Sequence, residues 1–103
     1  MDNFRPLKNC LENKTILLTG SGSGIGRTAA VTLAKYGAQL VLISKDLHKL
    51  ESLHEEIVNQ GLKEPLIHSM DFENAEEEEY QQIKVAIKDR FERLDGLINN
   101  AGI

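Results

Sequence analysis

Residues 15–26 combine a short apolar run with four glycines, and their order is suited to binding an anion. The run at 15–18 is rich in apolar and β-branched side chains, which predicts a buried strand, and residues 27–36 carry apolar side chains at helical spacing. The loop between them contains only hydroxyl side chains, one isoleucine and glycines. A strand, a glycine turn and a helix in this order direct backbone N–H groups and the helix dipole at one point. The stretch therefore predicts a phosphate-binding turn.

The spacing of the glycines distinguishes between the known kinds of phosphate-binding turn. A P-loop requires Lys and then Ser or Thr after its last glycine, whereas Gly26 is followed by Arg27 and Thr28. The pattern G-x-G-x-x-G is also absent, because Ile25 stands where its third glycine belongs. Residues 19–26 instead read T-G-x-x-x-G-I-G, which resembles the glycine motif of the short-chain dehydrogenase/reductase family. On this motif alone, a purely structural turn remains the alternative.

Two further matches support the resemblance. Residues 99–102 read Asn-Asn-Ala-Gly, which resembles the N-N-A-G that closes the fourth strand in this family. Asp71 follows an apolar run at 66–70, where the family places an acidic residue beside the adenine. The resemblance extends from about residue 12 to the end of the sequence. It implies a Rossmann-like, doubly wound fold and hydride transfer between NADP(H) and a carbonyl or alcohol substrate.

The elements that must position these motifs alternate between strands and helices. Strands are predicted at 15–18, 39–44, 65–70 and 97–99, and helices at 27–36, from an N-cap at Asp46 to about 60, and from about 74 to 91. This alternation predicts an α/β fold with a parallel sheet in the strand order 3-2-1-4. All three motifs then lie at carboxyl ends of strands, where such sheets bind ligands. Residues 1–13 are predicted to be an N-terminal extension, and residues 14–103 the N-terminal part of an NAD(P)-binding Rossmann domain.

The two later helices are expected to bury one face each. Helical spacing predicts the buried faces to be Leu47, Leu50, His54 and Ile57 on the second helix, and Tyr80, Ile83, Ile87 and Phe91 on the third. The carboxylates at 76–79 are interpreted as a solvated helix start, with an acidic metal site as the alternative.

The resemblance also implies a set of residues that bind the cofactor. The phosphate turn consists of Gly20, Gly24, Ile25 and Gly26, and the hydroxyls of Ser21 and Ser23 either donate to the same phosphate or serve only the turn. Ser44 and Lys45 follow the second strand, where this fold reads the adenosine ribose. A basic residue there implies NADP(H). NAD(H) stays open, because Asp46 is adjacent and Ser23 stands where some NADP-binding members carry a second basic residue.

The remaining cofactor residues follow the third and fourth strands. Asp71 would accept a hydrogen bond from the adenine amino group and Phe72 would line the ring, or else Asp71 caps the following turn. Asn99 would contact the adenosine side and steady its strand. Ala101 and Gly102 would bring backbone close to the ribose.

No catalytic residue is assigned within the chain. Tyr80 and Lys84 match the Tyr-x-x-x-Lys of the family's catalytic pair, but the family places that pair after N-N-A-G, together with a serine. His48 and His54 lie about 240° apart around a helix and cannot share a metal. Family members are more than twice as long. The sequence is therefore expected to be the N-terminal piece of a longer protein, a truncated product, or a half-domain completed by a partner.

The composition narrows the class of protein. The chain has 103 residues, 41% of them hydrophobic and 27% charged, with a net charge of −4, which is typical of one soluble domain and argues against a nucleic-acid partner. It contains no apolar run of membrane-spanning length and no signal-peptide core. Cys10 is the only cysteine, which favours the cytoplasm. An apolar edge at the fourth strand is expected to permit self-association.

Two classes of function remain after these arguments. The first is a short-chain oxidoreductase of which this chain is the dinucleotide-binding part. The second is a non-catalytic, truncated module for dinucleotide binding or assembly.

Overall fold

The fold is a four-stranded parallel sheet between two layers of helices. The computed structural model describes residues 10–22, 24–71 and 74–99. Its strands are β1 (Thr15–Thr19), β2 (Gln39–Ser44), β3 (Leu66–Ser69) and β4 (Gly96–Asn99), and its helices are α1 (Gly24–Lys35), α2 (Leu47–Asn59) and α3 (Glu77–Phe91). Neighbouring strands are parallel throughout, and their order is β3-β2-β1-β4. The predicted α/β class and strand order are therefore confirmed.

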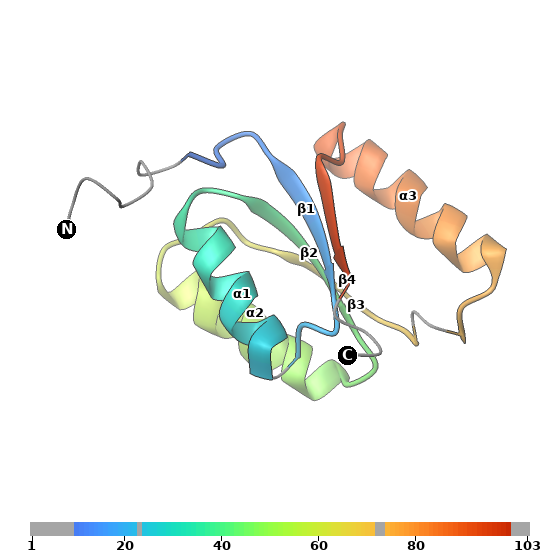
Figure 1. Ribbon diagram of the computed structural model, residues 1–103, viewed down its shortest axis with the longest axis horizontal. Coiled ribbons are helices and arrows are strands. Elements are labelled where there is room, and N and C mark those ends of the chain that lie inside the picture. The colour runs from blue at the N-terminus through green and yellow to red at the C-terminus, as the bar shows by residue number, and fades with distance from the viewer. Residues whose placement is uncertain (1–9, 23, 72–73, 100–103) are drawn as a thin grey trace.

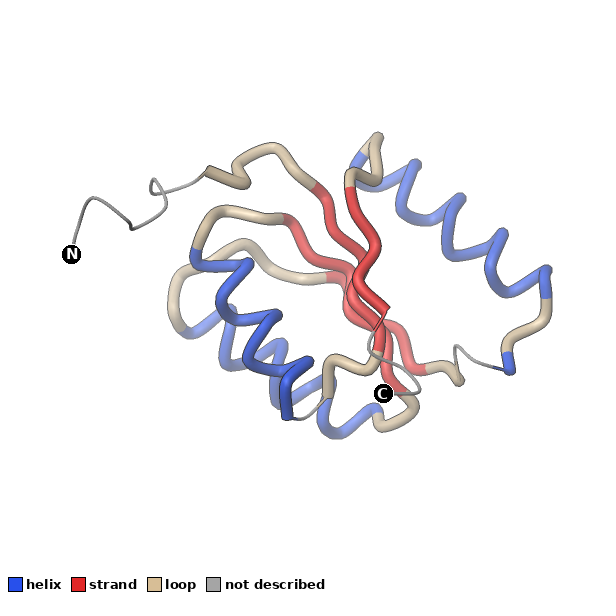
Figure 2. The backbone as a smooth tube through the Cα atoms, viewed as in Figure 1, coloured by secondary structure: helices blue, strands red, loops and turns tan. Residues whose placement is uncertain are grey.

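The helices divide unequally between the two faces of the sheet. Helices α1 and α2 lie together on one face, and α3 lies on the other (Figure 1). Figure 2 shows the strands enclosed between these two helical layers. Because the strands are parallel, the loops that follow β1, β2 and β3 all emerge at the same edge of the sheet.

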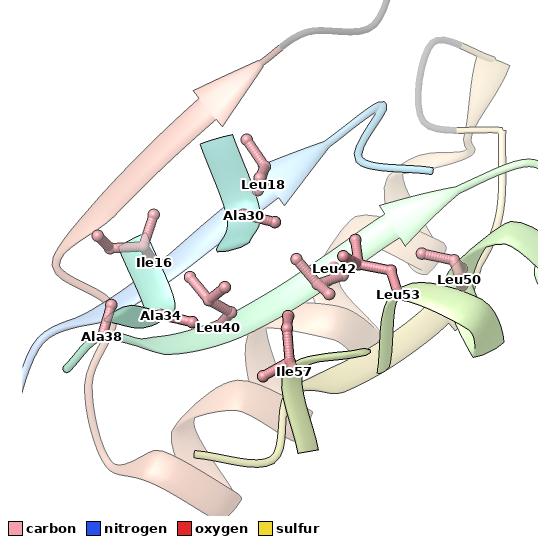
Figure 3. Close-up of a cluster of buried hydrophobic side chains, with 10 residues drawn as sticks. All are labelled: Ile16, Leu18, Ala30, Ala34, Ala38, Leu40, Leu42, Leu50, Leu53 and Ile57. Atoms are coloured by element: carbon pink, nitrogen blue, oxygen red, sulfur yellow. The ribbon is translucent and has the colours of Figure 1, made fainter. Parts of the chain in front are cut away.

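Alternate residues of β1 and β2 supply two separate hydrophobic cores, because successive side chains point to opposite faces. The larger core lies under α1 and α2 (Figure 3), and its buried members are Ile16, Leu18, Ala30, Ala34, Ala38, Leu40, Leu42, Leu50, Leu53 and Ile57. The core under α3 consists of Leu17, Val41, Ile43, Met70, Ile83 and Ile87. The small side chains of Ala30 and Ala34 are almost completely buried, so α1 packs closely on the sheet. This packing holds the start of α1 in a fixed place beside β1.

The predicted elements are all present, with different ends. The bounds of β2 agree with the prediction, whereas α1 begins at Gly24, earlier than the predicted residue 27. Helix α3 begins at Glu77, later than predicted, after a capping box formed by Glu76 and Glu79. The predicted N-cap is confirmed, since Asp46 Oδ1 accepts a hydrogen bond from Lys49 N at 3.2 Å.

The predicted buried faces of α2 and α3 are each correct in part. Helix α2 buries Leu50, Leu53 and Ile57, whereas Leu47 is 47% exposed. Leu47 is the first residue of the helix, and the buried face includes Leu53, which was not predicted. Helix α3 buries Ile83 and Ile87, and the other predicted members of its stripe are only half-buried.

Candidate functional site

The predicted site residues gather at one edge of the sheet, where the strands end. The register places Thr19 of β1 beside Ile43 of β2 on one side and Asn99 of β4 on the other. Ser44 of β2 is paired in turn with Ser69 of β3. The loops that carry the glycines, Lys45 and Asp71 follow directly after these residues. Residues far apart in the sequence are therefore brought to a common edge.

The glycine turn is crowded on one side and open on the other. Gly20 and Gly24 have φ angles of 63° and 59°, in the left-handed region that side chains disfavour. A Cβ on Gly26 would lie 2.2 Å from the carbonyl oxygen of Gly20, so only glycine lets the helix start pack on the loop. Around a Cβ on Gly24, no heavy atom of the described residues lies within 4 Å. That open space adjoins the N-terminus of α1, where helix N–H groups attract an anion. The turn therefore fits a phosphate group.

Ser21 and Ile25 differ sharply in exposure. Ser21 is fully buried, and its backbone N and its Oγ each lie 3.4 Å from the carbonyl oxygen of Ile43. This contact joins the loop to the end of β2. The side chain of Ile25 is 78% exposed in the first turn of α1. Ser23 lies outside the described residues, and the phosphate contacts predicted for both serines stay predictions.

After the end of β2, the Lys45 side chain is exposed, whereas the Asp46 carboxylate is bound to the start of α2. The Lys45 side chain is 71% exposed. Asp46 instead directs its carboxylate onto the first turn of α2 as an N-cap, and its backbone N donates to Ser44 Oγ at 3.3 Å. Capping satisfies an N–H group at the helix start, which explains why the carboxylate faces the helix.

Asp71 follows β3 and contacts Asn74 in the same loop and Lys45 after β2. Its Oδ2 accepts from Asn74 Nδ2 at 2.7 Å, and its carbonyl oxygen accepts from Asn74 N at 3.2 Å. Lys45 Nζ lies 3.7 Å from the same carboxylate oxygen. The Asp71 carboxylate is thus bound to a side chain of the following turn, and capping of that turn by the carboxylate stays an alternative. Its predicted adenine contact stays a prediction, and Phe72 lies outside the described residues.

Asn99 joins the carboxyl end of β4 to the end of β1. Thr19 Oγ1 donates a hydrogen bond of 2.7 Å to Asn99 Oδ1, and Thr19 is fully buried. This contact holds the end of β4 against β1 at the edge where the glycine turn begins. The residues predicted to approach the ribose, Ala101 and Gly102, lie outside the described residues, as does Asn100.

Sequence reasoning missed two contacts at this edge. A Cβ on Gly22 would lie 3.0 Å from both Lys49 Cβ and Ser44 Oγ, so the loop rests on the first turn of α2. Arg27 Nη2 donates to Glu56 Oε1 at 2.6 Å, which joins the start of α1 to α2. One signal for Lys49 was available, because it lies three residues after the predicted N-cap and hence in a turn at the site.

The described residues reveal no separate catalytic or metal centre. Tyr80 is half-buried and Lys84 exposed on α3, the helix that covers the opposite face from α1. Within residues 10–22, 24–71 and 74–99, no three His, Cys, Asp or Glu side chains are grouped to hold a metal ion. None of the helices in these ranges is both long and apolar enough to cross a membrane.

A parallel sheet in this strand order, with a glycine turn where β1 meets α1, defines a Rossmann-like nucleotide-binding protein. Residues 14–103 match the short chain dehydrogenase family, and the chain belongs to that family. The resemblance noted in the sequence is therefore confirmed. Members of the family are oxidoreductases that use NAD(P).

Individual relatives agree with this assignment. YciK, an uncharacterised oxidoreductase of Escherichia coli K12, is 34% identical over 98% of this chain and 40% of its own length. A short-chain dehydrogenase of Salmonella enterica serovar Typhi superposes with a TM-score of 0.90 at 35% identity, over 97% of this chain and 41% of that one. An E. coli CFT073 protein, assigned as a short-chain dehydrogenase and solved with NADPH, superposes with a TM-score of 0.87 at 35% identity, over 95% of this chain and 41% of that one. The chain thus spans less than half the length of these relatives.

Proposed function

We propose that this chain is the dinucleotide-binding part of an oxidoreductase that transfers hydride between NADP(H) and a carbonyl or alcohol substrate. The observation that carries the proposal is the glycine turn. It is closed by the contact of Gly26 with Gly20 and open beside Gly24, at the N-terminus of α1. When bound, the cofactor supplies or accepts the hydride. The residues of this chain bind it, orient it and select between NADP(H) and NAD(H).

The glycine turn would hold the pyrophosphate. Backbone N–H groups at the start of α1 would donate to it, near Gly24 and Gly26, and the helix dipole favours its negative charge. The exposed Ile25 would pack against the bound cofactor. Ser23 is proposed as a hydroxyl donor to the same oxygens. For Ser21 the burial against Ile43 favours the alternative role, in which the serine stabilises the turn.

The end of β2 would favour NADP(H) over NAD(H). A carboxylate aimed at the ribose is the usual way to reject a 2′-phosphate. Asp46 does not offer one, because its Oδ1 caps α2, whereas Lys45 is exposed beside Ser44. A second solved relative, a Shigella flexneri 2a protein, was likewise crystallised with NADP, which supports the same preference.

The ends of β3 and β4 would complete the adenosine site. We propose that Asp71 and Phe72 contact the adenine and that Asn99 contacts the adenosine side. The backbone at Ala101 and Gly102 would approach the ribose. Two hydrogen bonds hold Asp71 to Asn74, and its carboxylate lies 3.7 Å from Lys45 Nζ, which supports an adenosine-side role for Asp71. The bond from Thr19 to Asn99 supports the proposed steadying of β4.

The chain is proposed to consist of an extension, residues 1–13, and the partial Rossmann domain, residues 14–103. A cytoplasmic location is proposed from the single cysteine. A preparation restricted to these 103 residues is expected to bind NADP(H) weakly and to show no turnover, since no residue in it is assigned to proton transfer. In such a preparation, the outer edge of β4 is proposed to mediate self-association.

Calorimetric titration with NADP⁺ and NAD⁺, followed by a reductase assay over a panel of carbonyl compounds, tests the proposed function. The protein as isolated from its own cells is compared with the 103-residue preparation. We expect both to bind NADP⁺ more tightly than NAD⁺, and only a longer natural product to show turnover. Binding without turnover in the natural product would instead favour the non-catalytic module. Absence of dinucleotide binding from both preparations would refute the proposal.

A further inference from the structure

We propose that a pocket at the C-terminal end of α3 binds a small amphipathic carboxylate, of the class of medium-chain fatty acids. This inference goes beyond the proposed function and does not rest on it. The pocket has a volume of about 320 Å³. The described residues that line it belong to α3 and to the turn after it: Lys84, Ile87, Lys88, Glu92, Arg93 and Leu94. No residue of this set is assigned to the cofactor.

The pocket lies toward the edge of the sheet opposite the glycine turn. Helix α3 runs from the carboxyl end of β3 to the amino end of β4, and the pocket is built on its second half and on residues 92–94. The register of β4 on β1 pairs Gly96 with Ile16 at this edge, and Asn99 with Thr19 at the edge of the glycine turn. A ligand in the pocket would therefore lie away from the cofactor residues.

The walls of the pocket are mostly apolar. Ile87 is almost completely buried in the core under α3 and forms the floor, whereas Leu94 in the turn is 42% exposed. The methylene stems of Lys84 and Lys88 add to the apolar wall, because lysine side chains cover apolar surface while their ammonium groups stay in water. Such walls favour a hydrocarbon tail.

Two cations stand beside these apolar walls without a counter-ion. Lys84 and Lys88 are exposed and four residues apart, so they lie on the same side of α3. Within the part of the chain that the structure describes, neither ammonium group forms an ion pair with a carboxylate. Like charges one helical turn apart repel each other. A carboxylate bound between the two lysines would relieve this repulsion.

The other charged residues of the pocket do not cancel this positive charge. Arg93 Nε donates to Asp95 Oδ1 at 2.9 Å, so these two charges compensate each other. Among the described lining residues Glu92 is the one carboxylate, and it lies beyond Lys88 at the C-cap of α3. Two lysines against one glutamate leave an excess of positive charge in the pocket.

The size of the pocket favours a small molecule over a partner protein. Ligand pockets have volumes of roughly 300 to 1,000 Å³, and this pocket lies at the lower end of that range. A partner helix would need a longer groove, with anchors at i, i+3, i+4 and i+7. The described lining set offers only Ile87 and Leu94 as apolar side chains.

The charges also specify how the ligand would lie. Its carboxylate would accept charge-assisted hydrogen bonds from Lys84 and Lys88. This position keeps the carboxylate before the last carbonyl groups of α3, where the negative end of the helix dipole would disfavour it. The tail would then extend over Ile87 toward Leu94.

Calorimetric titration of the protein as isolated from its own cells tests the proposal, with sodium octanoate below its micelle concentration as the probe. Octan-1-ol has the same tail without the charge, and butyrate has the charge with a shorter tail. Octanoate should bind about tenfold more tightly than either, since it alone uses both the lysines and the apolar walls. Saturating NADP⁺ should change its affinity less than twofold.

Substitutions of the two lysines test the site itself. Lys84→Gln and Lys88→Gln should each weaken octanoate binding about fivefold and change octan-1-ol binding less than twofold. Lys84→Arg should retain most of the affinity. Lys35→Gln is the matched control, because it removes the same charge at the end of α1, on the opposite face of the sheet (Figure 1).

Four results would overturn the proposal. Failure of octanoate to bind would show that the pocket takes no such carboxylate in the complete protein. Binding that neither lysine variant weakens would place octanoate elsewhere, and loss of binding in NADP⁺ would place it in the cofactor site. Equal weakening of octanoate and octan-1-ol would show that the lysines only shape the pocket. An unchanged Tm of each variant shows that the fold is intact.

Discussion

At the scale of single residues, Gly26 and Gly24 are constrained by different physical causes. At Gly26 the cause is space, because a Cβ would lie 2.2 Å from the carbonyl oxygen of Gly20. At Gly24 it is the backbone angle, with φ at 59° and open space around the Cβ position. A steric conflict with backbone is relieved only by moving the helix, whereas an unfavourable φ costs a roughly constant amount.

This difference predicts the effect of alanine at the two positions. Gly26→Ala should lower the free energy of unfolding by about 3 kcal/mol or prevent folding. Gly24→Ala should lower it by only about 1 kcal/mol. Urea unfolding followed by circular dichroism measures both values. Equal losses at the two positions would show that the contact with Gly20 relaxes easily and does not limit the turn.

At the scale of elements, β4 is held to β1 at both ends. At the carboxyl end Thr19 Oγ1 donates to Asn99 Oδ1. At the other end Thr15 N donates to Asp95 Oδ2 at 2.8 Å, and Arg93 Nε donates to Asp95 Oδ1 at 2.9 Å. The Arg93 hydrogen bond, with help from Thr15 N, lowers the pKa of Asp95 below its ordinary value of 3.8. The ionised form of Asp95 is therefore the one that stabilises the strand pair.

The lowered pKa of Asp95 predicts how stability depends on pH. Because the unfolded chain binds this proton more readily, the contribution is complete above about pH 4 and is lost as pH falls through the lower folded pKa. Asp95→Asn should therefore reduce the free energy of unfolding at pH 7, and its difference from the unmodified chain should shrink in stronger acid. Urea unfolding between pH 7 and pH 2 measures this. Asp89→Asn, on the exposed side of α3, controls for loss of a carboxylate. A pH-independent difference would exclude the ionic contribution.

At the scale of the whole molecule, the two faces and edges of the sheet are covered unequally. Two helices cover one face and a single helix covers the other (Figure 1). No strand of the described residues pairs with the outer edge of β4. Leu97 and Ile98 on this strand are 56% and 37% exposed. An apolar strand at an open edge tends to pair with another chain.

We therefore expect a preparation of these 103 residues to associate as its concentration rises. Leu97→Lys should shift the association to higher concentration, because burying the ammonium at a strand interface is unfavourable. Sedimentation velocity at several concentrations measures the effect. Val85→Lys is the matched control, since Val85 is 57% exposed on α3, away from that edge. A monomer at every concentration would show that the outer edge of β4 does not mediate self-association.

The sequence by itself determined the topology and pointed to the location of the candidate site. The alternation of strand and helix periods predicted the order β3-β2-β1-β4. The motifs placed the candidate cofactor residues at the ends of these strands, and their contacts with a cofactor stay predictions. The helix cap at Asp46 was also predictable. These features depend on local signals, since periodicity, capping and turn glycines each involve residues a few positions apart.

Only the tertiary structure decided which side chains face one another across the loops. The burial of Ser21 against β2, the pairing of Lys45 with Asp71 and the path of Lys49 along Gly22 all join separate segments. The burial of Leu53 and the exposure of Leu47 on α2 were also decided by the packing of this helix on the sheet. Such contacts depend on how closely the helices pack on the sheet and where their first turns lie. Hydrophobic periodicity specifies which face of a helix is buried, but it does not specify how far along the sheet that helix begins.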